Sequence, residues 1–207
     1  MINTVIHGDC RKIDIPQVDL ILTDPPYGIG YKNEKLQRKS NSRFDEIQND
    51  EKEIDFKFLF DRPELKIIFG ANNFYKQLPH KGIWLCWDKR VNEAADSVLG
   101  SAFELAWCSK TNGYYKIYRV QHGGVVNHDM KYGEARQRWH PTQKPIELMK
   151  RIILDFTKEN DIILDPFCGS GSALVAAQQL NRRFIGIEID KKYYEISKTR
   201  LRPQTLL

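Results

Sequence analysis

The sequence predicts an α/β fold in which helices cover both faces of a mostly parallel sheet. Short apolar runs that read as buried strands recur along the chain and alternate with helical patterns. From residue 162 the order is strand, loop, helix, strand, helix, which is typical of the opening unit of a nucleotide-binding sheet. A length of 207 residues with 41% hydrophobic side chains fits a single domain, residues 1–207, with one core.

The first two predicted strands are Thr4–Gly8 and Val18–Thr23, and both read as buried and parallel. The second run ends on Asp24-Pro25-Pro26-Tyr27. Neither proline has an N–H group to give to a sheet ladder, so the chain must leave the sheet there. We therefore expect Asp24 at the carboxyl end of a buried strand.

The middle of the chain is harder to read. Residues 28–50 are polar, and we interpret them as a mobile basic loop. Residues 113–138 lack a clear period and are predicted to form a hairpin and a long connection, which would act as a short target-recognition segment. Further strands are expected at Leu65–Phe69, at Ile83–Trp87 and near Glu104–Cys108, with a helix or turn around Asn72–Tyr75.

The last third of the chain has the clearest pattern. A helix should begin at Pro145, with Met149, Ile152, Ile153 and Phe156 on its apolar face. The segments expected after it are a strand at Ile162–Asp165, a loop at Pro166–Gly171, a helix at Ser172–Leu180, a strand at Phe184–Ile189 and a helix at Lys191–Leu201.

Composition limits the class of protein only weakly. The net charge of +5 is compatible with nucleic-acid binding. The N-terminus lacks a signal-peptide pattern, and no apolar run approaches the about 20 residues of a membrane span. We therefore expect a cytoplasmic protein without a membrane partner. The four cysteines are scattered and form no CxxC pair, which indicates neither a zinc site nor disulfides: Cys10, Cys86, Cys108 and Cys168.

A glycine-containing loop, Phe167–Gly171, lies between a predicted strand and a predicted helix. Glycines let the backbone approach a ligand, and helix N–H groups attract its anionic end. Glu188 ends the next strand, where a carboxylate can accept both hydroxyls of a ribose. Together these features favour an adenosine-containing cofactor over a tight turn that binds nothing. NAD would satisfy the same loop and carboxylate.

The segment Asp24-Pro25-Pro26-Tyr27 separates these alternatives. Asp24 and the carbonyl group of Pro25 can both accept hydrogen bonds from one amino group, while Tyr27 offers a flat face to a base. The alternative is a Pro-Pro turn with a surface tyrosine. A preceding strand and a cofactor loop elsewhere in the chain favour the catalytic interpretation.

With these motifs the chain resembles the amino-directed DNA methyltransferases whose motifs run in the permuted, β-class order, with the catalytic motif first and the cofactor loop last. The resemblance spans nearly the whole chain and continues through Phe69–Tyr75, Trp87–Lys89, His140–Pro145 (HPTQKP), Asp165–Ser172 (DPFCGSGS) and Gly186–Asp190. It implies a Rossmann-like, S-adenosylmethionine-dependent methyltransferase fold. Ser172 stands where the family usually has threonine, and the short middle of the chain lacks a large target-recognition domain.

The resemblance also implies which residues bind S-adenosylmethionine. Asp165 and the loop after it would hold its methionine part, Glu188 its ribose, and Asp9 its adenine. His140, Thr142 and Lys144 would lie near its carboxylate, or Thr142 would cap the helix and Lys144 would be solvated. The full set of expected cofactor residues is Asp9, Cys10, Asp24, His140, Thr142, Lys144, Asp165, Phe167, Cys168, Gly169, Ser170, Gly171, Ser172, Glu188 and Ile189.

The implied reaction is direct methyl transfer, without a metal, to N6 of an adenine flipped out of double-stranded DNA, with Asp24, Pro25, Pro26 and Tyr27 at the catalytic centre. An N4-cytosine enzyme of the same class is the nearest alternative; Asp24 favours adenine, because the cytosine enzymes more often carry serine there. A catalytically idle cofactor- or DNA-binding protein and an NAD-dependent oxidoreductase leave these motifs without a role.

The partners implied are DNA and a second copy of the chain in a homodimer. The resemblance fits restriction-modification enzymes and orphan or phage methylases alike. The tryptophans Trp84, Trp87, Trp107 and Trp139 are expected to pack rather than to read bases. Basic residues around the catalytic turn and in the middle segment are candidates for phosphate contact: Lys32, Lys35, Arg38, Lys39, Arg43, Lys131, Arg136 and Arg138.

Overall fold

A central mixed sheet organises the computed structural model, which describes residues 2–27, 54–90, 101–111, 115–123, 126–127 and 143–202. Within these residues eight strands form the sheet. Their order across the sheet is β1 (Thr4–His7), β10 (Arg183–Glu188), β9 (Ile162–Asp165), β2 (Leu20–Thr23), β3 (Leu65–Phe69), β5 (Phe103–Cys108), β4 (Ile83–Asp88) and β6 (Lys116–Arg119).

Most neighbouring strands in this sheet are parallel. The strands from β1 to β3 run in one direction, and β4 pairs in parallel with β6. The exception is β5, which is antiparallel to both β3 and β4. The first residues of β5 therefore lie at the same edge of the sheet as the last residues of β2, β3, β4 and β9. The expected mostly parallel sheet is confirmed, and the reversed β5 is an addition to it.

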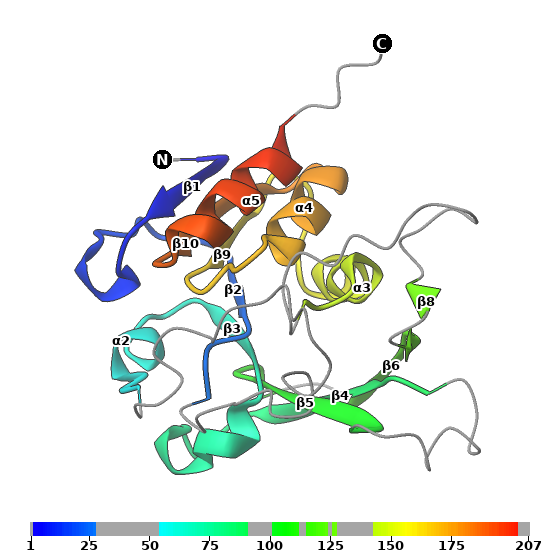
Figure 1. Cartoon of the computed structure of the whole chain (residues 1–207). Helices are drawn as coiled ribbons and strands as arrows, with labels where there is room; N and C mark the ends of the chain where they lie inside the picture. The colour runs from blue at the N-terminus through cyan, green and yellow to red at the C-terminus, as the bar shows by residue number, and fades with distance from the viewer. Residues whose placement is uncertain are drawn as a thin grey trace, which may run out of the picture.

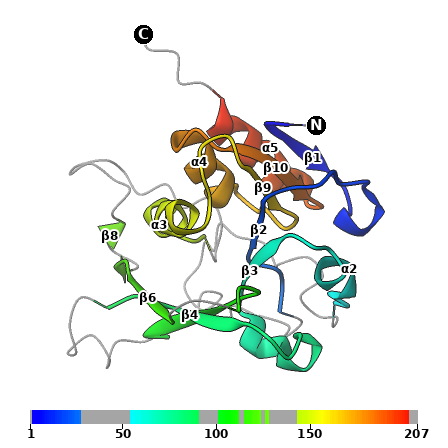
Figure 2. The same cartoon turned by 180° about the vertical axis from the view of Figure 1, so that it is seen from behind.

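Helices cover both faces of the sheet, as expected. On one face lie α3 (Ile146–Phe156), α4 (Ser172–Gln179) and α5 (Lys191–Leu201), which are neighbours in both views (Figures 1 and 2). The other face packs against η1 (Cys10–Lys12), α2 (Lys57–Phe60) and η2 (Ala71–Gln77), through a second cluster of buried side chains. The described residues include no helix long and apolar enough to span a membrane.

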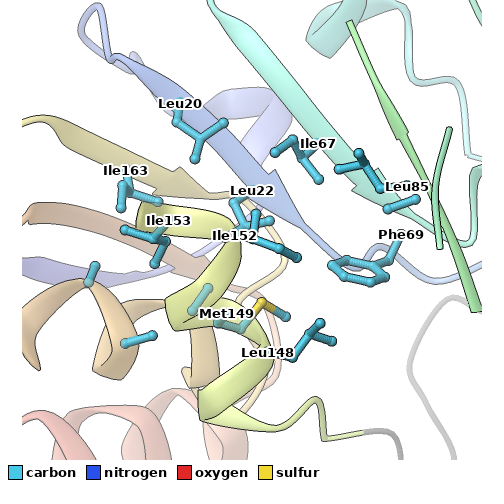
Figure 3. Close-up of a cluster of buried hydrophobic side chains, with 14 of the residues drawn as sticks. Leu20, Leu22, Ile67, Phe69, Leu85, Leu148, Met149, Ile152, Ile153 and Ile163 are labelled. Carbon is cyan, nitrogen blue, oxygen red and sulfur yellow. The ribbon is translucent and has the colours of Figure 1, made fainter. Parts of the chain in front are cut away.

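The core between α3 and the sheet follows the predicted helical period. Figure 3 shows Met149, Ile152 and Ile153 directed at the side chains of the central strands. Leu20 and Leu22 of β2 belong to this cluster, whereas Ile21 between them packs on the opposite face, because successive strand side chains alternate. Phe156 is half-buried against the same cluster, so the expected apolar face is confirmed.

The order of the strands marks the place for a ligand. The chain proceeds from β9 to β10 on one side of the sheet and from β2 to β3 on the other, so the order reverses between β9 and β2. Ligands of open α/β sheets bind outside the carboxyl ends of the strands at such a point. Here those two ends carry Asp165 and the Asp24 turn.

The expected elements lie close to the observed ones, with two short exceptions. The helix α2 and the single turn η1 had no counterpart in the sequence prediction. The hairpin expected in residues 113–138 is present as β7 (His122–Gly123) and β8 (Val126–Asn127), which pair antiparallel. Trp87 and Trp107 are buried and Trp84 packs against the core, whereas Trp139 lies outside the described residues.

Candidate active site

Asp24 lies where β2 leaves the sheet. Its carboxylate accepts two hydrogen bonds: Tyr27 Oη donates to Oδ1 at 2.5 Å, and Lys144 Nζ donates to Oδ2 at 2.5 Å. The side chain of Asp24 is 19% exposed, so it is accessible at the edge of the sheet but held from two sides. The prolines that follow break the ladder, as the sequence predicts.

Tyr27 lies against Gly70, the residue that follows β3. Gly70 has a φ of 66°, in the left-handed region, and a Cβ atom at this position would lie 1.9 Å from Cε1 of Tyr27. Only glycine leaves room for the tyrosine ring in this arrangement. The motif Phe69–Tyr75 thus contributes to the site through its glycine, which sequence reasoning had not singled out.

Lys144 is buried between two carboxylates. Its side chain is 6% exposed, and Nζ lies 3.0 Å from Oε2 of Glu104 in addition to its contact with Asp24. Burial favours the neutral amine, but Asp24 and Glu104 outweigh it and raise the pKa of Lys144. The alternative of a solvated Lys144 is wrong. Its contact with the cofactor carboxylate stays a prediction, as do those of His140 and Thr142, which lie outside the described residues.

Glu104, which sequence reasoning missed, also forms an ion pair with Lys89. Burial raises the pKa of Glu104, but Lys144 and Lys89 outweigh it, so the pKa lies below its ordinary value. No signal in the sequence connects Glu104, at the start of a strand, with Lys144, forty residues later. Their contact depends on the reversed direction of β5.

Asp165 links the catalytic strand to the cofactor loop. Thr23 Oγ1, at the end of β2, donates to Asp165 Oδ1 at 2.7 Å, and the backbone N–H group of Phe167 donates to the same atom at 3.2 Å. Asp165 is 6% exposed, and burial raises the pKa of its carboxyl group to about 7. A cation beside it would favour the ionised form.

The loop after Asp165 is held by its own backbone and by α5. Gly169 and Gly171 both have positive φ, and the Gly171 N–H group donates to the Cys168 carbonyl at 2.7 Å. Arg200 of α5 donates to the carbonyl group of Ser170 at 2.6 Å. Ser172 Oγ is buried and has no hydrogen-bond partner among the described residues. An unsatisfied hydroxyl at the start of a helix fits a loop that binds a polar ligand.

Glu188 is fixed by two backbone N–H groups. Gly169 donates to its Oε2 at 2.7 Å, and Asp190 donates to its Oε1 at 2.8 Å. Burial raises the pKa of Glu188, and these backbone hydrogen bonds oppose the rise. Each carboxylate oxygen keeps further acceptor capacity, so the pair of hydroxyls of a ribose fits this carboxylate.

The segment after β1 joins the same edge. The N–H group of Gly8 donates to the carbonyl of Glu188 at 2.9 Å, which brings Asp9 beside β10. Arg11 pairs with Asp9 at 2.7 Å, and its hydrogen bond lowers the pKa of Asp9 to about 2. Cys10 is buried, and burial raises the pKa of its thiol to about 12, which fits a packing role. Ile189 is 41% exposed at the end of β10.

The structure thus brings Asp9, Asp24, Asp165 and Glu188 to one edge of the sheet, although up to 179 positions separate them in the chain. The residues proposed to contact phosphate cannot be placed in this way. All of them lie outside the described residues: Lys32, Lys35, Arg38, Lys39, Arg43, Lys131, Arg136 and Arg138.

Comparisons with known proteins agree with this geometry. Residues 71–199 match the N6/N4 methyltransferase family model, described as DNA methylase. The chain is 29% identical to the type II methyltransferase M2.LlaDCHI of Lactococcus lactis subsp. cremoris, covering 95% of this chain and 88% of the relative. It is 31% identical, with the same coverage, to the Escherichia coli (strain K12) protein YubD.

Solved structures also resemble it. The complex of M1.HpyAVI with SAM is 25% identical and superposes with a TM-score of 0.53, covering 96% of this chain and 98% of the other. The cytosine-N4-specific PvuII DNA methyltransferase superposes with a TM-score of 0.61, covering 99% of this chain and 88% of the other. At 15% identity the PvuII comparison shows the fold alone.

Proposed function

Because the chain belongs to the N6/N4 DNA methylase family, we propose that it methylates the N6 amino group of adenine in double-stranded DNA. The family makes it an S-adenosylmethionine-dependent DNA methyltransferase that acts on an amino group. The observation that carries the finer proposal is the Asp24 carboxylate at the end of β2, beside the buried Asp165.

Asp24 and the Pro25 carbonyl group would prepare the amino group for attack. The lone pair of an adenine amino nitrogen is delocalised into the ring, which makes it a poor nucleophile. Two acceptors that bind its two N–H bonds would favour a pyramidal nitrogen with a localised lone pair. The protein then contributes mainly orientation and electrostatics.

Asp165, the loop from Phe167 to Ser172 and Glu188 would hold S-adenosylmethionine, with Asp9 at its adenine. When bound, this cofactor supplies a methyl group activated by a positively charged sulfur, for one in-line displacement. The buried hydroxyl of Ser172 and the fixed carboxylate of Glu188 support this assignment. The hydrogen bond from Thr23 to Asp165 would keep the cofactor strand in register with the catalytic turn.

The target base would leave the helix to reach Asp24, because its amino group is inaccessible inside the duplex. Stacking on Tyr27 would return roughly 1–3 kcal/mol of the cost of flipping. The basic residues that follow the turn, from Lys32 to Arg43, would contact the phosphate backbone, together with Lys131, Arg136 and Arg138.

N4 of cytosine is the second candidate target, because its amino group needs the same acceptors. The carboxylate of Asp24 favours adenine, since cytosine enzymes of this family more often carry serine there. Digestion of the methylated DNA to nucleosides and mass spectrometry distinguish the two products. N6-methyladenine is expected. N4-methylcytosine alone would reject the adenine assignment while leaving the enzyme class intact.

Transfer of a labelled methyl group from S-adenosylmethionine to DNA tests the catalytic role of Asp24. We expect Asp24→Ala to abolish transfer, because the amino group loses its acceptor, while cofactor affinity measured by calorimetry stays near that of the wild type. Asp61→Ala serves as a control, since Asp61 is exposed and forms its ion pair with the nearby, exposed Lys57. Near-normal turnover in Asp24→Ala would rule out this mechanism.

A further inference from the structure

We propose that Glu104 and Lys144 form a positioning pair that orients the Asp24 carboxylate toward the target amino group and balances the charge around it. The inference rests on the methyl transfer proposed for Asp24. It concerns two residues that need not touch either substrate, and it gives the buried Lys144 a role in the reaction.

The fold places this pair close to Asp24. Because β5 runs opposite to β3 and β4, its second residue, Glu104, lies at the edge of the sheet where β2 and β3 end. Lys144 lies two residues before α3, at the same edge. The ammonium group also lies 5.4 Å from the centre of the Phe69 ring, at the end of β3.

The side chains form a row of alternating charge. Lys144 Nζ lies 2.5 Å from Asp24 Oδ2 and 3.0 Å from Glu104 Oε2, and Lys89 holds the other oxygen of Glu104. Oε2 of Glu104 is shielded from solvent. Lys144 therefore cannot leave Asp24 without separating from Glu104 as well. This arrangement restrains rotation of the Asp24 carboxylate while leaving Oδ1 on the side of Tyr27.

The need for Glu104 follows from charge. A lysine beside Asp24 on its own would cancel the negative charge that should accept the amino hydrogens. It would also lie near the positive charge that develops on the nitrogen as the methyl group arrives. Glu104 offsets that ammonium group, so Asp24 keeps its negative potential. An ordinary buried ion pair contributes little to stability compared with apolar packing, which makes a purely structural reason weak.

Two substitutions that break the same ion pair test this proposal. Glu104→Gln and Lys89→Met both remove the ion pair between Lys89 and Glu104, but they change the local charge in opposite directions. The side chains are comparably shielded, with 29% and 15% exposed. A structural role predicts similar reductions in rate for both variants. The positioning pair predicts a reduced rate in Glu104→Gln alone.

The measurement is the single-turnover rate of methyl transfer with enzyme saturated by cofactor and DNA. Glu104→Gln should slow this rate by about tenfold to a hundredfold, with KM for DNA changed by less than about threefold. Glu104→Asp, which keeps the charge, should recover part of the rate. Lys89→Met should transfer at a rate close to that of the wild type.

The outcomes separate this proposal from the proposed function. Glu104→Gln at the wild-type rate, together with an inactive Asp24→Ala, would overturn the positioning pair and leave the catalytic role of Asp24 intact. An active Asp24→Ala would overturn the catalytic assignment itself. Equal reductions in rate for Glu104→Gln and Lys89→Met would also overturn the pair. If Glu104→Gln does not fold, Lys89→Met decides, because a structural role requires its rate to fall.

Discussion

Asp165 combines burial with an ionisable group at the point where two halves of the site meet. Its carboxyl group accepts hydrogen bonds from Thr23 and from the Phe167 backbone, which favour the ionised form. Burial is the larger effect and raises the pKa to about 7. Near neutral pH the free protein therefore holds a proton on about half of its Asp165 groups. A positively charged cofactor would have to displace that proton.

This proton makes cofactor affinity depend on pH. Because the folded-state pKa is raised to about 7, Asp165 is neutral below that pH, so affinity for S-adenosylmethionine should rise from pH 6 to pH 8 and then level off. Asp165→Asn should bind more weakly and show a flatter profile. Titration calorimetry in buffers of different ionisation enthalpy measures both affinity and proton release. A profile for Asp165→Asn that matches the wild type would contradict this role.

At the scale of elements, the packing of α4 on β10 sets the position of the cofactor loop. Gly186, inside β10, faces Leu174 of α4 and Cys168 of the loop. A Cβ atom at Gly186 would lie 2.3 Å from Cδ1 of Leu174 and 3.2 Å from Sγ of Cys168. Any side chain there would push the helix and the loop away from the sheet. The absence of a side chain is thus a requirement of this strand.

Gly186→Ala should lower the free energy of unfolding by about 1–3 kcal/mol, because it overpacks the space between β10 and α4, and should weaken cofactor binding as the loop shifts. Urea denaturation measures the first effect and calorimetry the second. In the double variant with Leu174→Ala the two destabilising effects should be less than additive, because the smaller side chain makes room. Additive effects would show that Leu174 does not limit the space.

The last elements of the chain were predicted with nearly the observed boundaries, because long apolar runs there are punctuated by proline and glycine. The helix α2 was missed, since four residues are too few to show a period. The direction of β5 was missed because an apolar run predicts a strand without predicting its direction. The hydrogen bond from Lys144 to Asp24 spans 120 positions, so local pattern could not reveal it.

At the scale of the whole molecule, the net charge of +5 matters through its placement. The basic segment that follows the catalytic turn is proposed to contact DNA. Replacing Lys35, Arg38 and Lys39 by glutamine should weaken binding to all DNA sequences. The slope of log affinity against log salt should also flatten, by about 0.9 for each phosphate that these side chains no longer neutralise.

The matched control removes three exposed basic residues, Lys158, Lys198 and Arg202, which follow α3 or lie near the end of α5, away from the carboxyl ends of the strands. Fluorescence anisotropy with a labelled duplex at several salt concentrations measures both triple variants. We expect the control to keep the wild-type slope. Equal flattening in both variants would indicate that overall charge, rather than the segment after the turn, attracts DNA.

The pairing of β1 with β10 has a consequence for how the protein is made. In the described sheet β1 has one neighbour, and that neighbour begins at Arg183. Translation releases β1 first and β10 almost last, so the early strand waits unpaired while most of the chain is synthesised. Asp9 and Asp24 leave the ribosome long before Asp165 and Glu188 exist. A nascent chain therefore holds half of each proposed binding site, and methylating capacity begins only when synthesis has passed Glu188.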